Sequence, residues 1–202
     1  MAEWKLFAGD VAHVSTASYH RDRERAPHLE QPGHRDRLLR AAEFVFVAAR
    51  LHARRADGAQ ATVSDLGCGD GGLLSVIQQK LKAWGYDFAP ANAAGWTERR
   101  VGAMALDVFG TDRGAVKLGD ITVVTEVLEH LTAPHEAVRW IATGSRYLVA
   151  SSPWNETDQN HDECHAWAWD MAGYRALIEQ GGYRLLRHEK VGRFQVVLGM
   201  RP

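Results

Sequence analysis

The sequence has only two cysteines, Cys68 and Cys164, among 202 residues. Two cysteines cannot form the disulfide framework of a small secreted domain, and a chain of this length can bury a sizeable core without one. No apolar run approaches the roughly 18 residues of a membrane-spanning helix. The first ten residues lack a basic region followed by an apolar stretch, so no secretory signal is expected. These absences predict a reduced, cytoplasmic protein with no membrane partner.

The sequence also lacks an excess of charge of either sign, internal repeats and low-complexity tracts. Its 24 basic and 25 acidic residues leave a net charge of −1, which gives no general attraction to nucleic acid. The arginine-rich stretch at residues 20–55 is interspersed with acidic residues, which favours a solvated surface of mixed charge. A nucleic-acid partner is therefore possible but not favoured, and the oligomeric state is left open.

The most informative feature that is present is the segment at residues 63–72, which reads VSDLGCGDGG. A short apolar run leads into Asp65, and an apolar helical pattern begins at Leu73. Three glycines occupy alternate positions between them: Gly67, Gly69 and Gly71. The pattern predicts a strand, a tight turn and a helix, with glycine where a Cβ atom would obstruct a ligand. The N-terminus of the helix would present free N–H groups to that ligand.

The spacing of this loop, D-x-G-x-G-x-G, differs from the G-x-G-x-x-G of dinucleotide sites, which disfavours a nicotinamide cofactor. Taken alone, the loop could also be an ordinary strand-to-helix turn. It resembles motif I of the class I S-adenosylmethionine (SAM)-dependent methyltransferases. The resemblance covers roughly residues 60–200 and implies SAM as the methyl donor, with S-adenosylhomocysteine (SAH) as the product.

Strand and helix patterns alternate along the chain. Strands are expected at 61–65, 82–88, 101–108, 121–125, 147–150, 183–191 and 194–200, and helices at 33–55, 73–81, 126–141 (interrupted at Pro134) and 171–180. Residues 151–169 are expected to form a polar, aromatic loop, and Gly192-Arg193 a hairpin turn. The alternation is typical of a doubly wound sheet.

We therefore predict a single α/β domain with a Rossmann-like sheet, mostly parallel, that ends in an antiparallel C-terminal hairpin. Within it, residues 1–58 are expected to form an N-terminal lid segment and helix. Residues 59–202 are expected to form the SAM-binding core.

An acidic residue closes or follows each of four expected strands: Asp65, Asp87, Asp107 and Glu126. The carboxyl ends of parallel strands meet at one edge of a sheet, where ligands bind. Asp87 lies 20 residues after Gly67, the distance at which a carboxylate meets ribose hydroxyls. Any one of the four could instead cap a helix, but their order strengthens the resemblance.

The resemblance also implies individual roles at the cofactor. Asp65 would accept hydrogen bonds from the loop or from the amino group of SAM. Asp107 would accept from the adenine amino group, with Val108 beside the ring. The residues expected to contact the cofactor are Asp65, Gly67, Cys68, Gly69, Gly71, Asp87, Phe88, Asp107, Val108 and Glu126.

A cluster of carboxylates and histidines follows the strand at 121–125. Glu126, Glu129 and His130 are spaced i, i+3 and i+4, so they would share one helical face. His165 follows the next strand at the same sheet edge. The E-V-L-E-H segment resembles small-molecule methyltransferases such as the ubiquinone-biosynthesis O-methyltransferases.

Three interpretations of this cluster stay open. His130 or His165, together with Glu129, could act as catalytic groups on the acceptor. The four residues Glu126, Glu129, His130 and His165 could bind a divalent metal, as in the small-RNA 3′-terminal 2′-O-methyltransferases that the segment also resembles. They could also only stabilise the local structure. No metal is favoured.

Three tryptophans, Trp154, Trp167 and Trp169, fall in the expected loop at 151–169. A polar loop is a poor place to bury them, so they are expected to line an acceptor pocket, with packing against the sheet as the alternative. Tyr19 would approach the same pocket from the N-terminal segment.

The predicted function is methyl transfer from SAM to an oxygen or nitrogen nucleophile of a small molecule. One alternative is a metal-dependent RNA ribose 2′-O-methyltransferase. Another is a non-catalytic domain that binds SAM or stabilises a partner.

Overall fold

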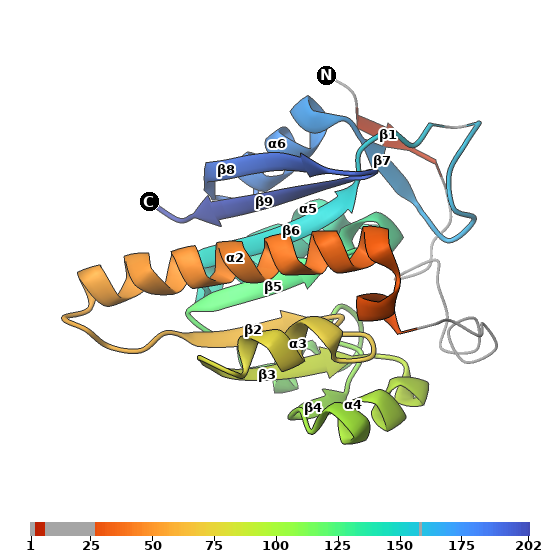
Figure 1. Cartoon of the computed structure of the whole chain (residues 1–202). Coiled ribbons are helices and arrows are strands. Elements are labelled where there is room, and N and C mark those ends of the chain that lie inside the picture. The colour runs from red at the N-terminus through yellow and green to blue at the C-terminus, as the bar shows by residue number, and fades with distance from the viewer. Residues whose placement is uncertain (1–2, 7–26, 158) are drawn as a thin grey trace.

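The computed structural model describes residues 3–6, 27–157 and 159–202 (Figure 1). Its centre is a seven-stranded sheet with the strand order β4-β3-β2-β5-β6-β9-β8. The strands are β2 (Thr62–Leu66), β3 (Lys82–Asp87), β4 (Ala103–Ala105), β5 (Ile121–Thr125), β6 (Tyr147–Pro153), β8 (Arg184–Val191) and β9 (Phe194–Met200). The five strands from β4 to β6 are parallel, and β9 pairs antiparallel with both β6 and β8. The predicted Rossmann-like fold with its C-terminal hairpin is confirmed.

Helices cover both faces of this sheet. They are α2 (Pro32–Arg55), α3 (Gly72–Ile77), α4 (Ala93–Arg99), α5 (Pro134–Gly144) and α6 (Met171–Gln180). Short 3-10 turns lie at η1 (His28–Glu30), η2 (Pro90–Asn92), η3 (Arg113–Ala115) and η4 (Leu128–His130). Helices α2 and α3 contribute to one apolar cluster and α5 and α6 to the other.

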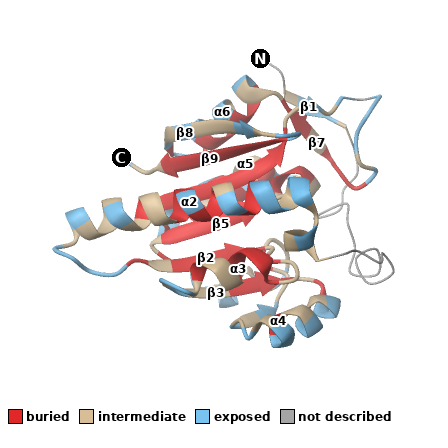
Figure 2. Cartoon of the chain, viewed as in Figure 1, coloured by how far each residue is buried: buried red, intermediate tan, exposed pale blue. Residues whose placement is uncertain are grey.

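Strand β5 shows why the sheet is buried on both sides. Val123 packs in the α2 cluster and its neighbour Val124 in the α5 cluster, because successive side chains of a strand point to opposite faces. A strand buried on both faces is rich in apolar, β-branched residues. Residues 121–125 are β-branched throughout, and three of the five are apolar. Figure 2 shows the central strands buried and the outer side of α2 exposed.

Several predicted elements differ from the structure. The third strand is only Ala103–Ala105, at the sheet edge, and α3 ends at Ile77, before Leu81. Residues 126–141 do not form one helix. Glu126 has a φ of 56° in the left-handed region, so η4 and α5 follow as separate elements. The expectation that Glu126, Glu129 and His130 share a helical face is therefore wrong.

The expected loop at residues 151–169 also contains regular structure. Strand β6 extends to Pro153, and β7 (Trp167–Trp169) pairs antiparallel with β1 (Glu3–Lys5). This pairing joins segments more than 160 residues apart, which local patterns do not report. Helix α4 was likewise not predicted.

Some predictions concern parts of the chain that the structure describes incompletely. Tyr19 and most of the expected lid lie outside the described residues, so the division at residue 58 stays a prediction. Within the described ranges, no helix has both the length and the apolar character needed to cross a membrane. Both cysteines are free thiols.

Candidate active site

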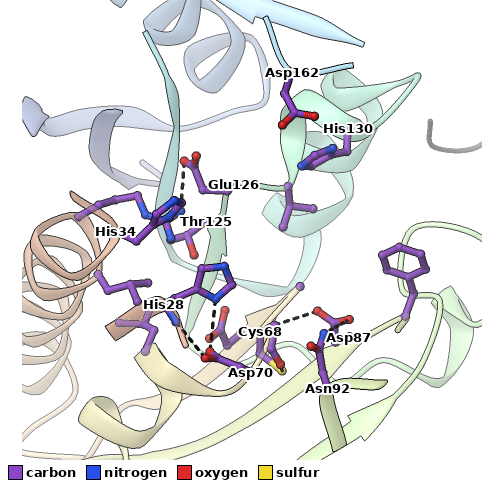
Figure 3. A pocket seen from close by; sticks show the side chains of 18 of the residues that line it. His28, His34, Cys68, Asp70, Asp87, Asn92, Thr125, Glu126, His130 and Asp162 are labelled. Carbon is purple, nitrogen blue, oxygen red and sulfur yellow. Dashed lines mark hydrogen bonds and ion pairs between the residues drawn. The ribbon is translucent and has the colours of Figure 1, made fainter. Parts of the chain in front are cut away.

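A cleft of about 1110 Å³ opens where the carboxyl ends of β2, β3 and β5 meet (Figure 3). In the sheet, β3 lies on one side of β2 and β5 lies on the other, so the strand order reverses at β2. Ligands bind at such a reversal in open α/β sheets. The glycine loop, the start of α2 and residues 153–165 complete the walls. The volume is sufficient for a nucleoside-sized ligand with an acceptor beside it.

The three loop glycines serve different purposes. All three have positive φ: 78° at Gly67, 52° at Gly69 and 77° at Gly71. A Cβ atom at Gly67 would collide with Val127, and one at Gly71 would lie 2.8 Å from Val101, so these two positions are needed for packing. At Gly69 the nearest atom would be in the His28 ring, 3.7 Å away. Of the three loop glycines, only Gly69 therefore has open space beside it, and that space is part of the cleft.

Asp87 holds the glycine loop at the end of β3. Its Oδ2 accepts a hydrogen bond from the Gly69 N–H at 2.8 Å. Its Oδ1 accepts from the Ala89 N–H at 2.8 Å and from Asn92 Nδ2 at 3.0 Å. Each carboxylate oxygen can accept two hydrogen bonds, so Oδ2 retains capacity for a hydroxyl in the cleft.

Asp65 is a buried carboxyl group beside the loop. It is 1% exposed, and its Oδ1 has no hydrogen-bond partner among the described residues. Burial, together with the negative charge of Asp87, raises the pKa of Asp65 to about 7, although Arg37 acts in the opposite direction. An unsatisfied carboxyl oxygen at the cleft wall is suited to a donor from a ligand, such as an ammonium group.

The other residues expected at the cofactor are distributed as follows. Phe88, Asp107 and Val108 line the cleft even though β4 is shorter than predicted, and Cys68 and Glu126 line it as well. Gly71 is not among the lining residues, because it faces Val101 instead.

Glu129, His130 and His165 come together without a shared helix. Atoms of the three side chains able to bind a metal lie within 4.8 Å of one another. The Ala166 N–H donates to the Glu129 carbonyl at 2.6 Å, which ties η4 to the segment that carries His165. The two imidazole rings meet edge-on, with centroids 4.7 Å apart.

Each imidazole of this cluster is oriented through its Nδ1 atom. His130 Nδ1 lies 2.9 Å from the Cys164 carbonyl oxygen. His165 Nδ1 lies 2.6 Å from Oε2 of Glu156, a mostly buried carboxylate. Glu156 itself lines the cleft. A carboxylate at Nδ1 fixes the tautomer with the proton on that nitrogen, so Nε2 of His165 is the basic one.

Glu129 is the most deeply buried member of the cluster. It is 0% exposed, and within the described part of the chain neither carboxylate oxygen has a hydrogen-bond partner. Burial, aided by the Glu156 carboxylate, raises the pKa of Glu129 to about 8, while Arg37 opposes the shift. Glu129 does not line the cleft.

Glu126 faces away from the histidine pair. Its Oε1 lies 3.2 Å from Nη1 of Arg37 and accepts a hydrogen bond from Ser151 Oγ at 2.9 Å. Of the four residues proposed as metal ligands, the structure therefore brings together Glu129, His130 and His165 but not Glu126.

The three tryptophans do not line the cleft. Trp169 is 1% exposed, packs on Tyr174 and stacks with Trp167 at 6.1 Å between ring centroids. Trp154 lies under Lys190 and donates from Nε1 to the Gly192 carbonyl. These contacts are those of the alternative expectation, packing. Trp169 lies in the apolar cluster beneath α5 and α6, and Trp167 packs against that cluster.

Sequence reasoning missed several residues of the cleft: His34, Arg37, Asp70, Glu156 and Arg193. The position of Arg37 in the helical pattern could have indicated it, because Arg37 directly precedes the apolar Leu38 and lies on the buried side of α2. Glu156 has no such signal, because it lies in an irregular segment next to residues of ordinary loop composition.

Comparison with known proteins agrees with this geometry. The profile of the family described as "Methyltransferase domain" matches residues 34–191, well over half of the chain. The chain belongs to this methyltransferase family. It is a SAM-dependent methyltransferase, as the glycine loop predicts, and SAM is its cofactor.

Solved structures share the fold of this methyltransferase. The N-methyltransferase NodS from Bradyrhizobium japonicum WM9, in complex with SAH, is 15% identical, with a TM-score of 0.69 over 92% of this chain and 96% of that one. Magnesium protoporphyrin IX methyltransferase (ChlM) from Synechocystis PCC 6803, with bound SAH, is 16% identical, with a TM-score of 0.62 over 92% and 93%.

The [4+2]-cyclase SpnF is 12% identical, with a TM-score of 0.58 over 70% of this chain and 75% of that one. The fold thus hosts more than one reaction, and identities this low establish the fold alone. No curated protein sequence matches the methyltransferase.

The residues of the cleft fit SAM. Gly69 leaves room for it, Asp65 provides an unsatisfied acceptor for an ammonium group, and Asp87 retains an acceptor for a ribose hydroxyl. These three features lie on β2, its loop and β3, so they form one continuous side of the cleft.

Asp87→Ala is expected to weaken SAH binding by about 1–3 kcal/mol, because a charged hydrogen-bond acceptor is lost and the Gly69 N–H loses its partner. Isothermal titration calorimetry with SAH measures the change. Asp57→Ala, in the turn after α2 and away from the cleft, is the control. An unchanged affinity in Asp87→Ala would remove the residue from the cofactor site.

Proposed function

We propose that this methyltransferase transfers the methyl group of SAM to an oxygen or nitrogen nucleophile of a small molecule, with His165 as the general base. The observation that carries the proposal is the 2.6 Å contact between His165 Nδ1 and Glu156 Oε2 at the wall of the cleft. This contact directs the basic Nε2 atom of a largely buried imidazole to another partner.

The bound cofactor supplies a methyl group on a positively charged sulfur, which becomes neutral when the acceptor takes the methyl group. The protein's own tasks are to position the acceptor and to remove its proton. His165 Nε2 accepts that proton, and the Glu156 carboxylate stabilises the imidazolium that results. His130, beside His165, forms part of the wall that holds the acceptor.

His165→Ala is expected to lower the rate of methyl transfer by about 10²–10⁴-fold with little change in SAH affinity, because the base acts on the acceptor and not on the cofactor. Release of SAH from SAM, measured with any acceptor that the wild-type protein methylates, gives the rate. Glu156→Gln keeps the shape of the contact but removes its charge, so a smaller loss in kcat is expected. His52→Ala, on the distal part of α2, is the control. A fully active His165→Ala variant would exclude the base.

A second candidate, a metal-dependent methyltransferase that acts on an RNA ribose hydroxyl, is favoured by the cluster of Glu129, His130 and His165. A buried carboxylate without a hydrogen-bond partner among the described residues and two imidazoles oriented through Nδ1 are a donor set for a divalent ion. Such an ion would supply the charge that activates the hydroxyl.

This second candidate predicts about one equivalent of a divalent ion in the purified protein and loss of methyl transfer after treatment with a chelator, restored by added metal. Metal analysis and the SAH-release assay measure both. Glu129→Gln should lose the ion while SAH binding persists. A metal-free, chelator-resistant enzyme rejects the second candidate and leaves the first.

A further inference from the structure

Two arginines line the cleft around one phenylalanine, on the side away from Asp87. The guanidinium groups of Arg37, on α2, and Arg193, in the β8–β9 turn, each lie 5.0 Å from the ring centroid of Phe194. The ring of His34 lies 5.1 Å from the same centroid. Figure 3 shows His34 and Glu126 across the cleft from Asp87 and Asn92. Arg37 and Arg193 are referred to below as the arginine pair.

Arg37 is buried at 3% exposure, yet its hydrogen-bonding groups are not satisfied within the described residues. Its Nε has no acceptor, and its Nη1, 3.2 Å from Oε1 of Glu126, lacks the geometry of a hydrogen bond. Burial lowers the pKa of Arg37 to about 10, so the group remains charged at neutral pH. Unsatisfied donors on a buried cation at a cleft wall indicate a partner that binds there.

Arg193 is an exposed cation with no carboxylate partner in the part of the chain that the structure describes. Its guanidinium group lies over the ring of Phe194. Arg193 also lowers the pKa of Arg37, which means that the two positive charges repel each other. Glu129 and Asp65, together with Glu126 at 3.2 Å, compensate part of the charge of Arg37, and no carboxylate of the described residues pairs with Arg193. An anion between the two would relieve this repulsion.

Arg193 lies apart from the expected cofactor, whereas Arg37 is near enough to Asp65 to interact with it electrostatically. The glycine loop follows β2 and Asp87 ends β3, whereas Arg193 precedes β9. β9 is the third strand from β2 in the opposite direction, through β5 and β6. With strands about 4.8 Å apart, β9 lies roughly 14 Å from β2. The histidine cluster follows β5 and β6, so Arg193 is on its side of the cleft. Arg37 reaches this side through its contact with Glu126, which follows β5.

We propose that Arg37 and Arg193 bind an anionic group, a carboxylate or a phosphate, on the methyl acceptor. A guanidinium group matches both anions through parallel N–H donors, and the cation–π contact with Phe194 restrains the position of each group. The inference rests on the proposed function, because it assigns a substrate class to the same cleft. It makes the acceptor a small molecule with a negative charge remote from the methylated atom.

The test is a binding experiment with the full-length protein saturated with SAH. Benzoate, phenyl phosphate and the neutral benzamide are titrated at constant ionic strength and followed by calorimetry. We expect at least one of the two anions to bind about tenfold or more tightly than benzamide. Arg193→Gln should remove this preference, and Arg193→Lys should restore part of it. Arg184→Gln, an exposed arginine at the other end of β8, is the matched control and should behave like the wild type.

Three results would overturn the proposal. The first is equal binding of the anions and benzamide by the wild type, or binding of none of the three. The second is a preference that survives in Arg193→Gln. The third is a matching loss of SAH affinity in Arg193→Gln, which would assign the arginine pair to the carboxylate of the cofactor. Because no turnover is measured, failure here is distinct from failure of the general base, which shows in the His165→Ala rate.

Discussion

Gly69→Val is expected to abolish SAH binding, with the Kd rising at least about a hundredfold. Gly69 has a φ of 52°, and a Cβ atom there would point into open space bounded by the His28 ring at 3.7 Å. The loop cannot shift to make room, because both backbone groups of Gly69 are held. The Gly69 N–H donates to Asp87, and the Gly69 carbonyl accepts from Trp96 Nε1 at 2.7 Å. A branched side chain at this position would both strain the backbone and occupy the cofactor's space.

Gly58→Val is the matched control for this prediction. Gly58 has a φ of 86°, and a Cβ atom there would have nothing within 4 Å. The variant should therefore carry a similar backbone strain of about 1–3 kcal/mol without any effect on the cleft. Urea unfolding gives the strain in both variants, and calorimetry gives the SAH affinity. If Gly69→Val bound SAH as well as Gly58→Val does, the glycine loop would not be the cofactor site.

Trp169→Ala is expected to lower the free energy of unfolding by about 3–5 kcal/mol, as for other large aromatic side chains in a core. Trp169 is 1% exposed, stacks with Trp167 and packs on Tyr174 in the cluster beneath α5 and α6. The cleft does not include it, so the folded fraction of the variant should bind SAH with wild-type affinity. Chemical unfolding and calorimetry measure the two quantities.

Trp154→Ala provides the comparison for Trp169. Trp154 is only partly buried, and it contacts Lys190 and the Gly192 carbonyl near the surface. Its removal is expected to cost about 1 kcal/mol. A Trp169→Ala variant that kept wild-type stability but lost acceptor binding would return Trp169 to the acceptor pocket.

Local patterns determined much of the fold. The strand at 121–125, the helix at 171–180 and the strand at 194–200 have the predicted limits, because strong periodicity reports which backbone form buries a segment. The glycine loop could be predicted equally well, since a positive φ and a close approach of the backbone to a ligand both favour glycine. The strand patterns also placed Asp87 at the end of β3 and Asp107 shortly after β4, even though β4 is shorter than predicted.

The acceptor side of the cleft depended on contacts between distant segments or within irregular ones. Glu126 adopts a left-handed conformation and faces Arg37, 89 positions earlier in the chain. Glu156 reaches His165 from an irregular segment. Periodicity cannot report such contacts, because they depend on how elements pack and not on which elements form.

The sequence by itself determined the cofactor and the sheet, since a glycine loop and strand-end carboxylates encode both locally. Only the tertiary structure decided that Trp169 belongs to the core, that Glu126 lies apart from the histidine cluster and that two arginines contact Phe194. The burial and the charge of these residues depend on side chains that lie far away in the sequence. The folded sheet brings those side chains together, so the sequence pattern alone cannot report them.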